Sequence, residues 1–161
     1  MDTLHELEQA EALLKPFAGE MSRGEANRVD VPLEVGQLKA AVKALVDAHW
    51  GYLGAIAGVD KPAPAEEGGP AANGHTEVIY IFFQGAAVAA LRVLVPYEGG
   101  SVPTVCDLIP SATIYERELI ELFGVTVTGT PTTEKLVLPD DWPDGVYPLR
   151  KSFTGFDAQQ V

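Results

Sequence analysis

The chain has 161 residues, of which 47% are hydrophobic and 21% are charged, so its composition is that of a globular domain able to bury a core. Its 23 acidic and 11 basic side chains give a formal charge of −12 at pH 7, which argues against nucleic acid or an anionic membrane surface as a partner. The single cysteine, Cys106, excludes a disulfide within the chain and a cluster or zinc site held by the chain's own thiolates.

No stretch of the sequence is apolar for long enough to span a bilayer. The first residues are acidic and helix-forming, unlike the basic leader and apolar run of a secretory signal. We therefore expect a cytoplasmic protein whose contact with a membrane comes only through its partners.

The first fifty residues predict two helices. Thr3 and Glu6 have the spacing of a capping box, and the apolar residues after them predict a helix that ends at the first proline and glycine of the chain. Residues 20–28 are polar and predict a loop, and residues 29–31 predict a short strand. After Pro32, apolar residues at three- and four-residue spacing predict a second helix that packs on one side: Val35, Leu38, Val42 and Leu45.

The middle of the chain predicts strands. Residues 52–59, 77–83 and 86–95 are rich in apolar, aromatic and β-branched side chains. The last two runs flank Gln84-Gly85, which is typical of a hairpin turn. Residues 60–76 are rich in Pro, Gly, Ala and Glu, and predict a surface loop or mobile insertion.

The last third predicts a helix, a strand and an extended tail. A short helical turn is expected from Pro103, and residues 112–123 predict a helix that ends at Gly124, a typical C-terminal glycine. A strand is expected over 125–128. Because the strands come mostly in a run with helices at the ends, we predict an α+β fold: an antiparallel sheet with helices packed on one face, and an extended C-terminal tail.

Few residues carry a recognisable chemical signature. His5, His49 and His75 are scattered at no metal-ligand spacing, and none adjoins a serine or cysteine as a nucleophile's base would. Cys106 lacks basic neighbours, so a structural thiol is favoured over a reactive one. The glycines form no dinucleotide-binding or phosphate-binding motif.

The cluster Glu116-Arg117-Glu118, with Glu121 one turn on, is unusual. In a helix Arg117 and Glu121 are four residues apart and can pair, while Glu118 points about 100° away from Arg117. The charge pattern is typical of a solvated helix face. Acid–base catalysis by Glu116 or Glu118 is a second hypothesis, which no nucleophile or further catalytic group in the sequence supports.

Residues 136–151 form a second unusual segment. Its prolines exclude a helix or a central strand, yet Trp142, Tyr147 and Leu149 are large anchors without a local core. Two hypotheses fit: an interface that recruits a partner through these anchors, or a clasp over the chain's own sheet. Arg150 and Lys151 are rare cations in an acidic chain, and we expect a charge-assisted contact with a carboxylate on a neighbour.

Several short motifs occur in a recognisable order between residues 110 and 153. They are Glu116-Arg117-Glu118, Phe123-Gly124, Gly129-Thr130-Pro131, and a last stretch in which Trp142 and Tyr147 precede Pro148-Leu149-Arg150-Lys151. In this order they resemble the 30 kDa subunit family of respiratory complex I (NADH-quinone oxidoreductase). The same module occurs in membrane-bound, energy-converting [NiFe] hydrogenases and formate hydrogenlyases.

The resemblance implies a cofactor-free subunit of an electron-transfer arm. Such a protein packs beside the large subunit of the hydrogenase or complex I type and near iron–sulfur subunits, on the cytoplasmic side of the membrane. Iron–sulfur clusters and, in a hydrogenase, a [NiFe] centre would belong to those partners. The motif residues named above are implied to have interface or structural roles, not catalytic ones. The implied organisation is a helical extension over 1–28, an α+β domain over 29–128 and a partner-docking tail over 129–161.

The sequence departs from the complex I members of the family at residues 129–135. Those members usually read Gly-His-Pro-Asp-Leu-Arg-Arg, whereas this chain reads Gly-Thr-Pro-Thr-Thr-Glu-Lys, and Glu121 replaces the usual Asp. Residues 141–151 are more similar to the hydrogenase-linked branch. We therefore favour an energy-converting (group 4 type) hydrogenase over an NADH-quinone oxidoreductase. An independent binding module and a stand-alone acid–base enzyme are the alternative hypotheses.

Overall fold

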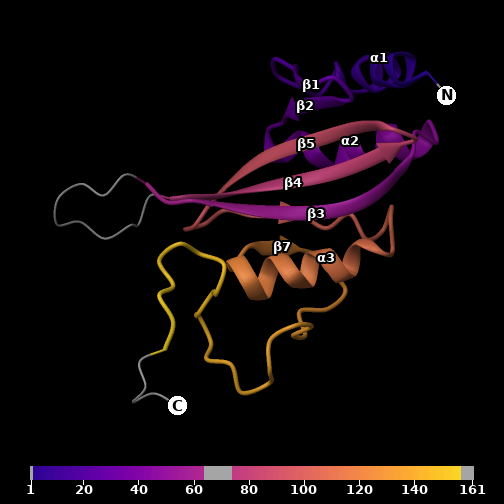
Figure 1. Cartoon of the computed structure of the whole chain (residues 1–161). Coiled ribbons are helices and arrows are strands. Elements are labelled where there is room, and N and C mark those ends of the chain that lie inside the picture. The colour runs from indigo at the N-terminus through magenta and orange to yellow at the C-terminus, as the bar shows by residue number, and fades with distance from the viewer. Residues whose placement is uncertain (1, 64–73, 157–161) are drawn as a thin grey trace.

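The computed structural model describes residues 2–63 and 74–156. Figure 1 shows an open, twisted sheet with helices against it and an extended segment at the C-terminal end. The elements are α1 (Thr3–Leu14), β1 (Ser22–Glu25), β2 (Arg28–Pro32), α2 (Val35–Asp47), β3 (Tyr52–Lys61), β4 (His75–Gln84), β5 (Ala87–Pro96), β6 (Ser101–Pro103), α3 (Ala112–Glu118), the π-helix η1 (Leu119–Phe123) and β7 (Thr126–Thr128).

The main sheet has five strands in the order β1-β2-β5-β4-β3, and a separate pair is formed by β6 and β7. The predicted α+β fold and the predicted β4–β5 hairpin are confirmed. The main sheet is mixed rather than wholly antiparallel, because β2 runs parallel to β5. The separate pair of β6 and β7 is also parallel. α2, β3 and β4 lie between β2 and β5 in the sequence, yet the hairpin places β5 beside β2. Such a long-range pairing leaves no signal in the local sequence.

The helices pack on one face of the sheet. On β5 every second side chain from Ala87 to Val95 is buried in the core with residues of α1 and α2. Tyr80 lies opposite Leu91 in the sheet and shares that face, as do Val78 and its neighbour Gly58. A Cβ at Gly58 would lie 2.6 Å from the Phe123 ring, so η1 also packs on this face.

Four local predictions need correction. Asp2, rather than Thr3, caps α1 through its side chain, which accepts from the Leu4 amide. The polar residues 22–25 form β1 because they pair with β2 across a two-residue turn. Pro103 ends the strand β6 rather than beginning a helical turn, and the turn forms two residues later, where the Leu108 and Ile109 amides donate to the Val105 carbonyl. The helix predicted over 112–123 changes to a π-helical turn after residue 118, and it ends as expected at Gly124, whose φ is +70°.

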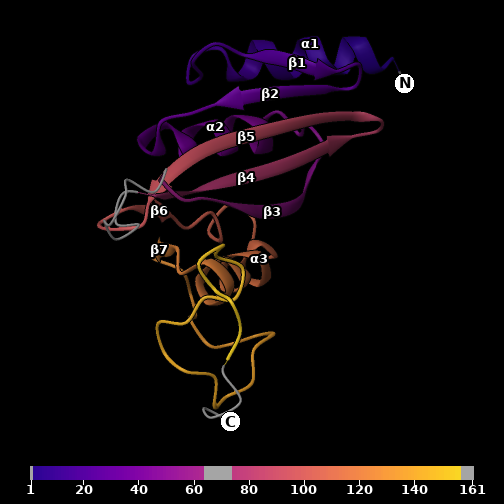
Figure 2. The same ribbon diagram turned by 60° about the vertical axis from the view of Figure 1, so that its left-hand side comes forward.

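Figures 1 and 2 show the segment after β7 below α3, at the opposite end of the molecule from α1. Residues 64–73 of the predicted loop and 157–161 of the predicted tail lie outside the described residues. Within the described part of the chain, no helix has both the length and the apolar character that crossing a membrane requires.

Candidate functional site

Glu116 is fully buried and ties α3 to the loop before it. Its carboxylate accepts hydrogen bonds from the Thr104 hydroxyl at 2.8 and 3.0 Å, from the Val105 amide at 2.8 Å and from the Cys106 thiol at 3.2 Å. A buried carboxylate needs several hydrogen-bond donors, because burying it without partners costs several kcal/mol. Glu116 is therefore not part of a solvated helix face.

Cys106 is half-buried beside this carboxylate. Burial raises the pKa of the Cys106 thiol, and the hydrogen bond to Glu116 raises it further against an opposing effect of Thr104. A raised pKa keeps the sulfur protonated, which is the state in which it donates to Glu116. This geometry favours the structural role that the sequence predicts for the cysteine.

Arg117 and Glu121 fasten the segment after β7 to α3 and η1. Arg117 donates from Nε to the Glu134 carbonyl and from Nη2 to the Lys135 carbonyl, both at 2.7 Å. The Glu121 carboxylate accepts from the three amides of residues 136–138 at 3.0, 2.8 and 3.2 Å. The pair expected between Arg117 and Glu121 therefore does not form, because each side chain meets backbone groups of the opposite polarity.

The side chain of the third motif residue, Glu118, is half-buried and makes no hydrogen bond or ion pair with the described residues.

Gly124, directly after η1, is favoured at its position for two reasons. Its φ of +70° suits glycine, and a Cβ there would lie 2.4 Å from the Tyr147 ring. The absence of a side chain at Gly124 thus allows the tail to pack closely against the end of η1.

Arg150 holds the far part of the tail on the domain. Its Nε donates to the Phe123 carbonyl at 2.7 Å, and its guanidinium lies 4.3 and 4.6 Å from the ring centres of Tyr97 and Tyr147. Such cation–π contacts strengthen when the cation is partly desolvated. Within the described residues Arg150 thus meets aromatic rings and a carbonyl, and the expected carboxylate on a neighbouring chain stays a prediction.

Asp60 connects the same region to the end of β3. It is buried, accepts a hydrogen bond from the Tyr97 hydroxyl, and accepts another from the Lys151 amide at 2.8 Å. Burial and the bond to Asp60 raise the pKa of Tyr97 to about 12. The Lys151 side chain itself is exposed.

We call residues 129–156 and their contacts with α3, η1 and Tyr97 the tail clasp. Gly129 turns the chain after β7 with a φ of +80°, exposed Pro131 follows, and half-buried Pro148 precedes Leu149, whose amide donates to the Leu122 carbonyl at 3.1 Å. Trp142 packs with two phenylalanines at ring distances of 5.1 and 6.0 Å. The tail clasp leaves several large apolar side chains exposed: Leu136, Val137, Leu149 and Phe156.

Residues 31–159 match the family described as respiratory-chain NADH dehydrogenase, 30 Kd subunit. The chain belongs to this family. The matched range includes every motif residue discussed above. The match thus supports the resemblance that those motifs indicate.

Curated members of the family include proteins of two kinds of assembly. The chain is 31% identical to hydrogenase-4 component G of Escherichia coli K12 over 146 residues, which cover 87% of this chain and 25% of that protein. It is 39% identical to an NADH-quinone oxidoreductase subunit of Roseiflexus sp. RS-1 over 77 residues, which cover 47% of this chain and 43% of that protein. The matches therefore span less than half of each relative.

A solved structure shares the fold. A chain in the structure of the membrane-bound sulfane sulfur reductase, an archaeal respiratory membrane complex, matches with a TM-score of 0.71. The match covers 91% of this chain and 84% of that chain at 24% identity. This likeness concerns the fold alone.

Several residues of the tail clasp were not identified from the sequence. Asp60 lies in the predicted loop over 60–76, Tyr97 follows the predicted strand over 86–95, and Glu121 was assigned only a pairing with Arg117. The prolines at positions 139, 143 and 148 are a usable signal, because they exclude regular secondary structure and so leave the neighbouring amides without backbone acceptors. Chemically, the clasp is a set of hydrogen bonds that orders an irregular segment. Among residues 2–63 and 74–156, no three His, Cys, Asp or Glu side chains gather as metal ligands would.

Proposed function

We propose that this chain acts as a cofactor-free subunit in the electron-transfer arm of a complex I-like membrane oxidoreductase, of the energy-converting group 4 [NiFe] hydrogenase type. The family match over residues 31–159 carries the proposal. The long alignment with hydrogenase-4 component G, over 87% of the chain, supports the hydrogenase branch.

The tail clasp suits a docking role in such an arm. Its backbone is already ordered on the domain, while apolar side chains such as Val137 and Leu149 stay exposed. A partner that covers them gains apolar contact without ordering the segment first, and preorganisation lowers the entropic cost of association. We propose the large subunit of the hydrogenase or complex I type, together with iron–sulfur subunits, as these partners.

The redox groups would then lie outside this chain. With Cys106 as its single cysteine, the chain lacks the thiolates that iron–sulfur clusters require. We propose that the clusters and the [NiFe] centre are bound by the partner subunits. The chain would be peripheral on the cytoplasmic side of the membrane through those same subunits.

A second candidate is the 30 kDa subunit of an NADH-quinone oxidoreductase. The observation in its favour is the 39% identity to a subunit of such an enzyme from Roseiflexus, over 77 residues. The two candidates differ in the redox partner of the assembly, not in the role of this chain.

The test is to isolate the assembly from membranes through an affinity tag on this chain. We expect hydrogen-dependent reduction of a viologen dye and nickel plus iron in the assembly, whereas the isolated chain binds neither metal. NADH oxidation by a nickel-free assembly selects the second candidate. A chain that purifies without other subunits contradicts both.

A matched pair of variants tests the tail clasp as the docking surface. Val137→Glu, in the tail, should reduce the amount of large subunit recovered with the chain by about tenfold, as expected when a charge is buried at an interface. Leu4→Glu, an equally apolar and exposed position in α1 outside the family match, should leave recovery unchanged. Equal recovery with both variants would place the docking surface elsewhere.

A further inference from the structure

The face of the sheet opposite the helices is open and partly apolar. Arg92 lies opposite Ile79 in the β4–β5 hairpin, so both side chains point away from the face that carries Leu91 and Tyr80. Exposed apolar side chains lie on the strands of this face or at its edge: Tyr52, Val59 and Leu94. Val59 and Leu94 flank Glu77 across the sheet, and Tyr52 lies at the other end of the face, opposite Phe83.

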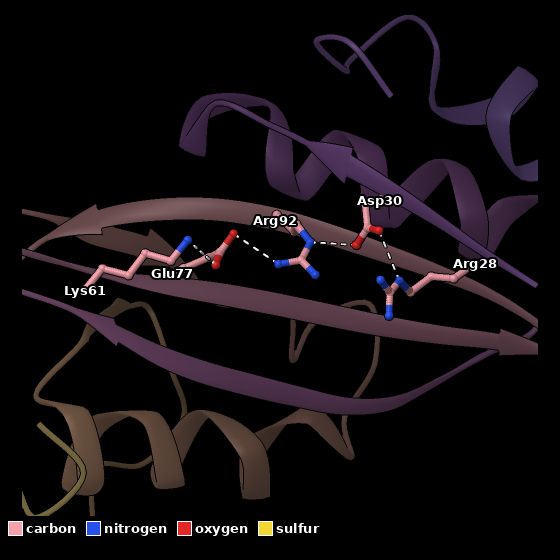
Figure 3. A network of polar contacts seen from close by, with 5 residues as sticks. All are labelled: Arg28, Asp30, Lys61, Glu77 and Arg92. Atoms are coloured by element: carbon pink, nitrogen blue, oxygen red, sulfur yellow. Dashed lines mark hydrogen bonds and ion pairs between the residues drawn. The ribbon is translucent and has the colours of Figure 1, made fainter. Parts of the chain in front are cut away.

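Five charged residues form a connected network across this face (Figure 3). Arg92 on β5 donates to Asp30 on β2 at 2.7 Å and to Glu77 on β4 at 3.2 Å. Arg28 pairs with the other oxygen of Asp30 at 3.0 Å, and Lys61 on β3 pairs with the other oxygen of Glu77 at 2.7 Å. The network therefore joins four neighbouring strands.

The network presents its cations, and not its carboxylates, to the outside. The side chains of Asp30 and Glu77 are only 13% and 10% exposed, whereas those of Arg28, Arg92 and Lys61 are 36%, 30% and 44% exposed. Each carboxylate is held by two cations, and Figure 3 shows one terminal nitrogen of Arg92 turned away from both of them. That nitrogen makes no hydrogen bond with the described residues.

The carboxylates thus orient the cations and leave donors free. Three cations against two carboxylates give this cluster a formal charge of +1, in a chain whose total is −12. Arginine whose position is fixed in advance loses little entropy when it binds a carboxylate, and such bonds are among the strongest polar contacts at interfaces. The network is therefore prepared to receive an anionic group.

A groove of about 610 Å³ adjoins the network. Lys61, Glu77 and Arg92 line it on the sheet side together with Leu94, while its other wall is largely apolar and includes Phe17, Leu33 and Val35. Glu34 also lines the groove, at the solvent-exposed start of α2. A cationic floor beside an apolar wall suits a ligand that has both characters.

We propose that this face binds a protein segment of a partner subunit in which a carboxylate side chain adjoins a large apolar one. The carboxylate would meet the free donors of Arg92 and Lys61, and the apolar side chain would lie against Leu94 and the apolar wall of the groove. Exposed apolar side chains at both ends of this face, Tyr52 opposite Phe83 and Leu94 opposite Glu77, favour a polypeptide over a small anion. The inference rests on the proposed role as a subunit and adds a second contact surface to the tail clasp.

Photo-crosslinking in the intact assembly tests the position of the contact. Leu94→p-benzoylphenylalanine and Val137→p-benzoylphenylalanine place the same reactive group on the sheet face and on the tail clasp. We expect the Leu94 position to crosslink to a partner peptide with Asp or Glu within a few residues of an aromatic or aliphatic side chain. A crosslink to lipid, to this chain or to a peptide without acidic residues would overturn the inference, as would no crosslink at all.

Charge variants test the chemistry of the contact. The assembly is purified from cells that lack this chain, and the affinity of the purified full chain for it is measured. Leu94→Glu sets a like charge against the expected carboxylate and should weaken binding about tenfold, whereas Leu94→Lys should stay within about threefold. Leu4→Glu is the control, because Leu4 and Leu94 are both 53% exposed. Equal weakening by the two Leu94 variants, or none, would overturn the inference.

These experiments separate the two proposals. If the unmodified chain fails to bind the assembly, the proposed function fails. If it binds, and the tail position crosslinks while the sheet position does not, the proposed function stands and the sheet-face contact is refuted.

Discussion

Glu121→Gln should loosen the tail clasp without unfolding the domain. The buried carboxylate of Glu121 accepts from three consecutive backbone amides, those of Leu136, Val137 and Leu138. Oε2 takes two of them and Oε1 takes one. A glutamine whose oxygen replaces Oε2 keeps two neutral bonds and turns its own amide group toward the Val137 N–H, so the third bond is lost.

The magnitude follows from the strength of these bonds. Hydrogen bonds to a charged acceptor contribute about 1.5 kcal/mol at the weaker end of their range and neutral ones about 1 kcal/mol, so the change costs about 2.5 kcal/mol. Because residues 136 and 137 are exposed, the loss should appear as local opening. An energy of about 2.5 kcal/mol corresponds to about 60-fold faster amide hydrogen exchange at residues 136–138.

Exchange rates measured by NMR on the variant and the unmodified chain check this prediction. Glu118→Gln is the matched control, since it removes a charge from the same helix at a side chain that makes no hydrogen bond with the described residues. It should change exchange at residues 136–138 by less than about threefold. Unchanged exchange in Glu121→Gln would refute the assignment of Glu121 as the acceptor that holds the tail.

Two further variants test the network and the glycine under the tail. Burial opposes ionisation of Asp30 and Glu77, but their cationic partners outweigh it and lower the pKa of each; the network should therefore stabilise the fold at neutral pH and lose this effect below about pH 4. Arg92→Leu should reduce the loss of unfolding free energy between pH 7 and pH 2, measured by urea unfolding at each pH. An unchanged pH dependence of this free energy would contradict the prediction. Gly124→Ala should lower the free energy of unfolding by about 3 kcal/mol, because φ is positive there and the tyrosine ring adjoins. Gly145→Ala is the control: φ is positive there too but the space is open, so it should cost about 1 kcal/mol in the same assay. Equal costs would exclude the ring contact.

The motif residues were recognised from sequence, but their contacts were not. The spacing of Arg117 and Glu121 predicted a pair, and such a pair on a helix surface contributes only about 0.3–0.5 kcal/mol. The amides of residues 136–138 lie in an irregular stretch and need acceptors, so satisfying them is worth more. The hydrogen bonds to these amides therefore outweigh the helix-surface pair. The amides lie about fifteen positions away from Glu121 in the sequence.

The sheet face illustrates the same limit. Arg28, Asp30, Lys61, Glu77 and Arg92 are dispersed over 65 positions of the sequence, and no spacing relates them. They meet because β2 pairs with β5 in parallel and because β4 lies between β5 and β3. Once that strand order is known, their alternation along each strand places all five on one face.

The sequence by itself determined what depends on neighbours along the chain. Apolar and β-branched runs on both sides of Gln84-Gly85 predicted the β4–β5 hairpin, and helical spacing predicted α2. A glycine marked the end of η1. These features depend on dihedral preferences and on the burial of one face, which are local properties. The tertiary structure decided which strands pair, why the polar residues of β1 become a strand, and how Asp60 meets the backbone of Lys151 across 91 positions. Those outcomes depend on how whole elements pack and on which buried polar groups still need partners. No short stretch of residues determines either of these.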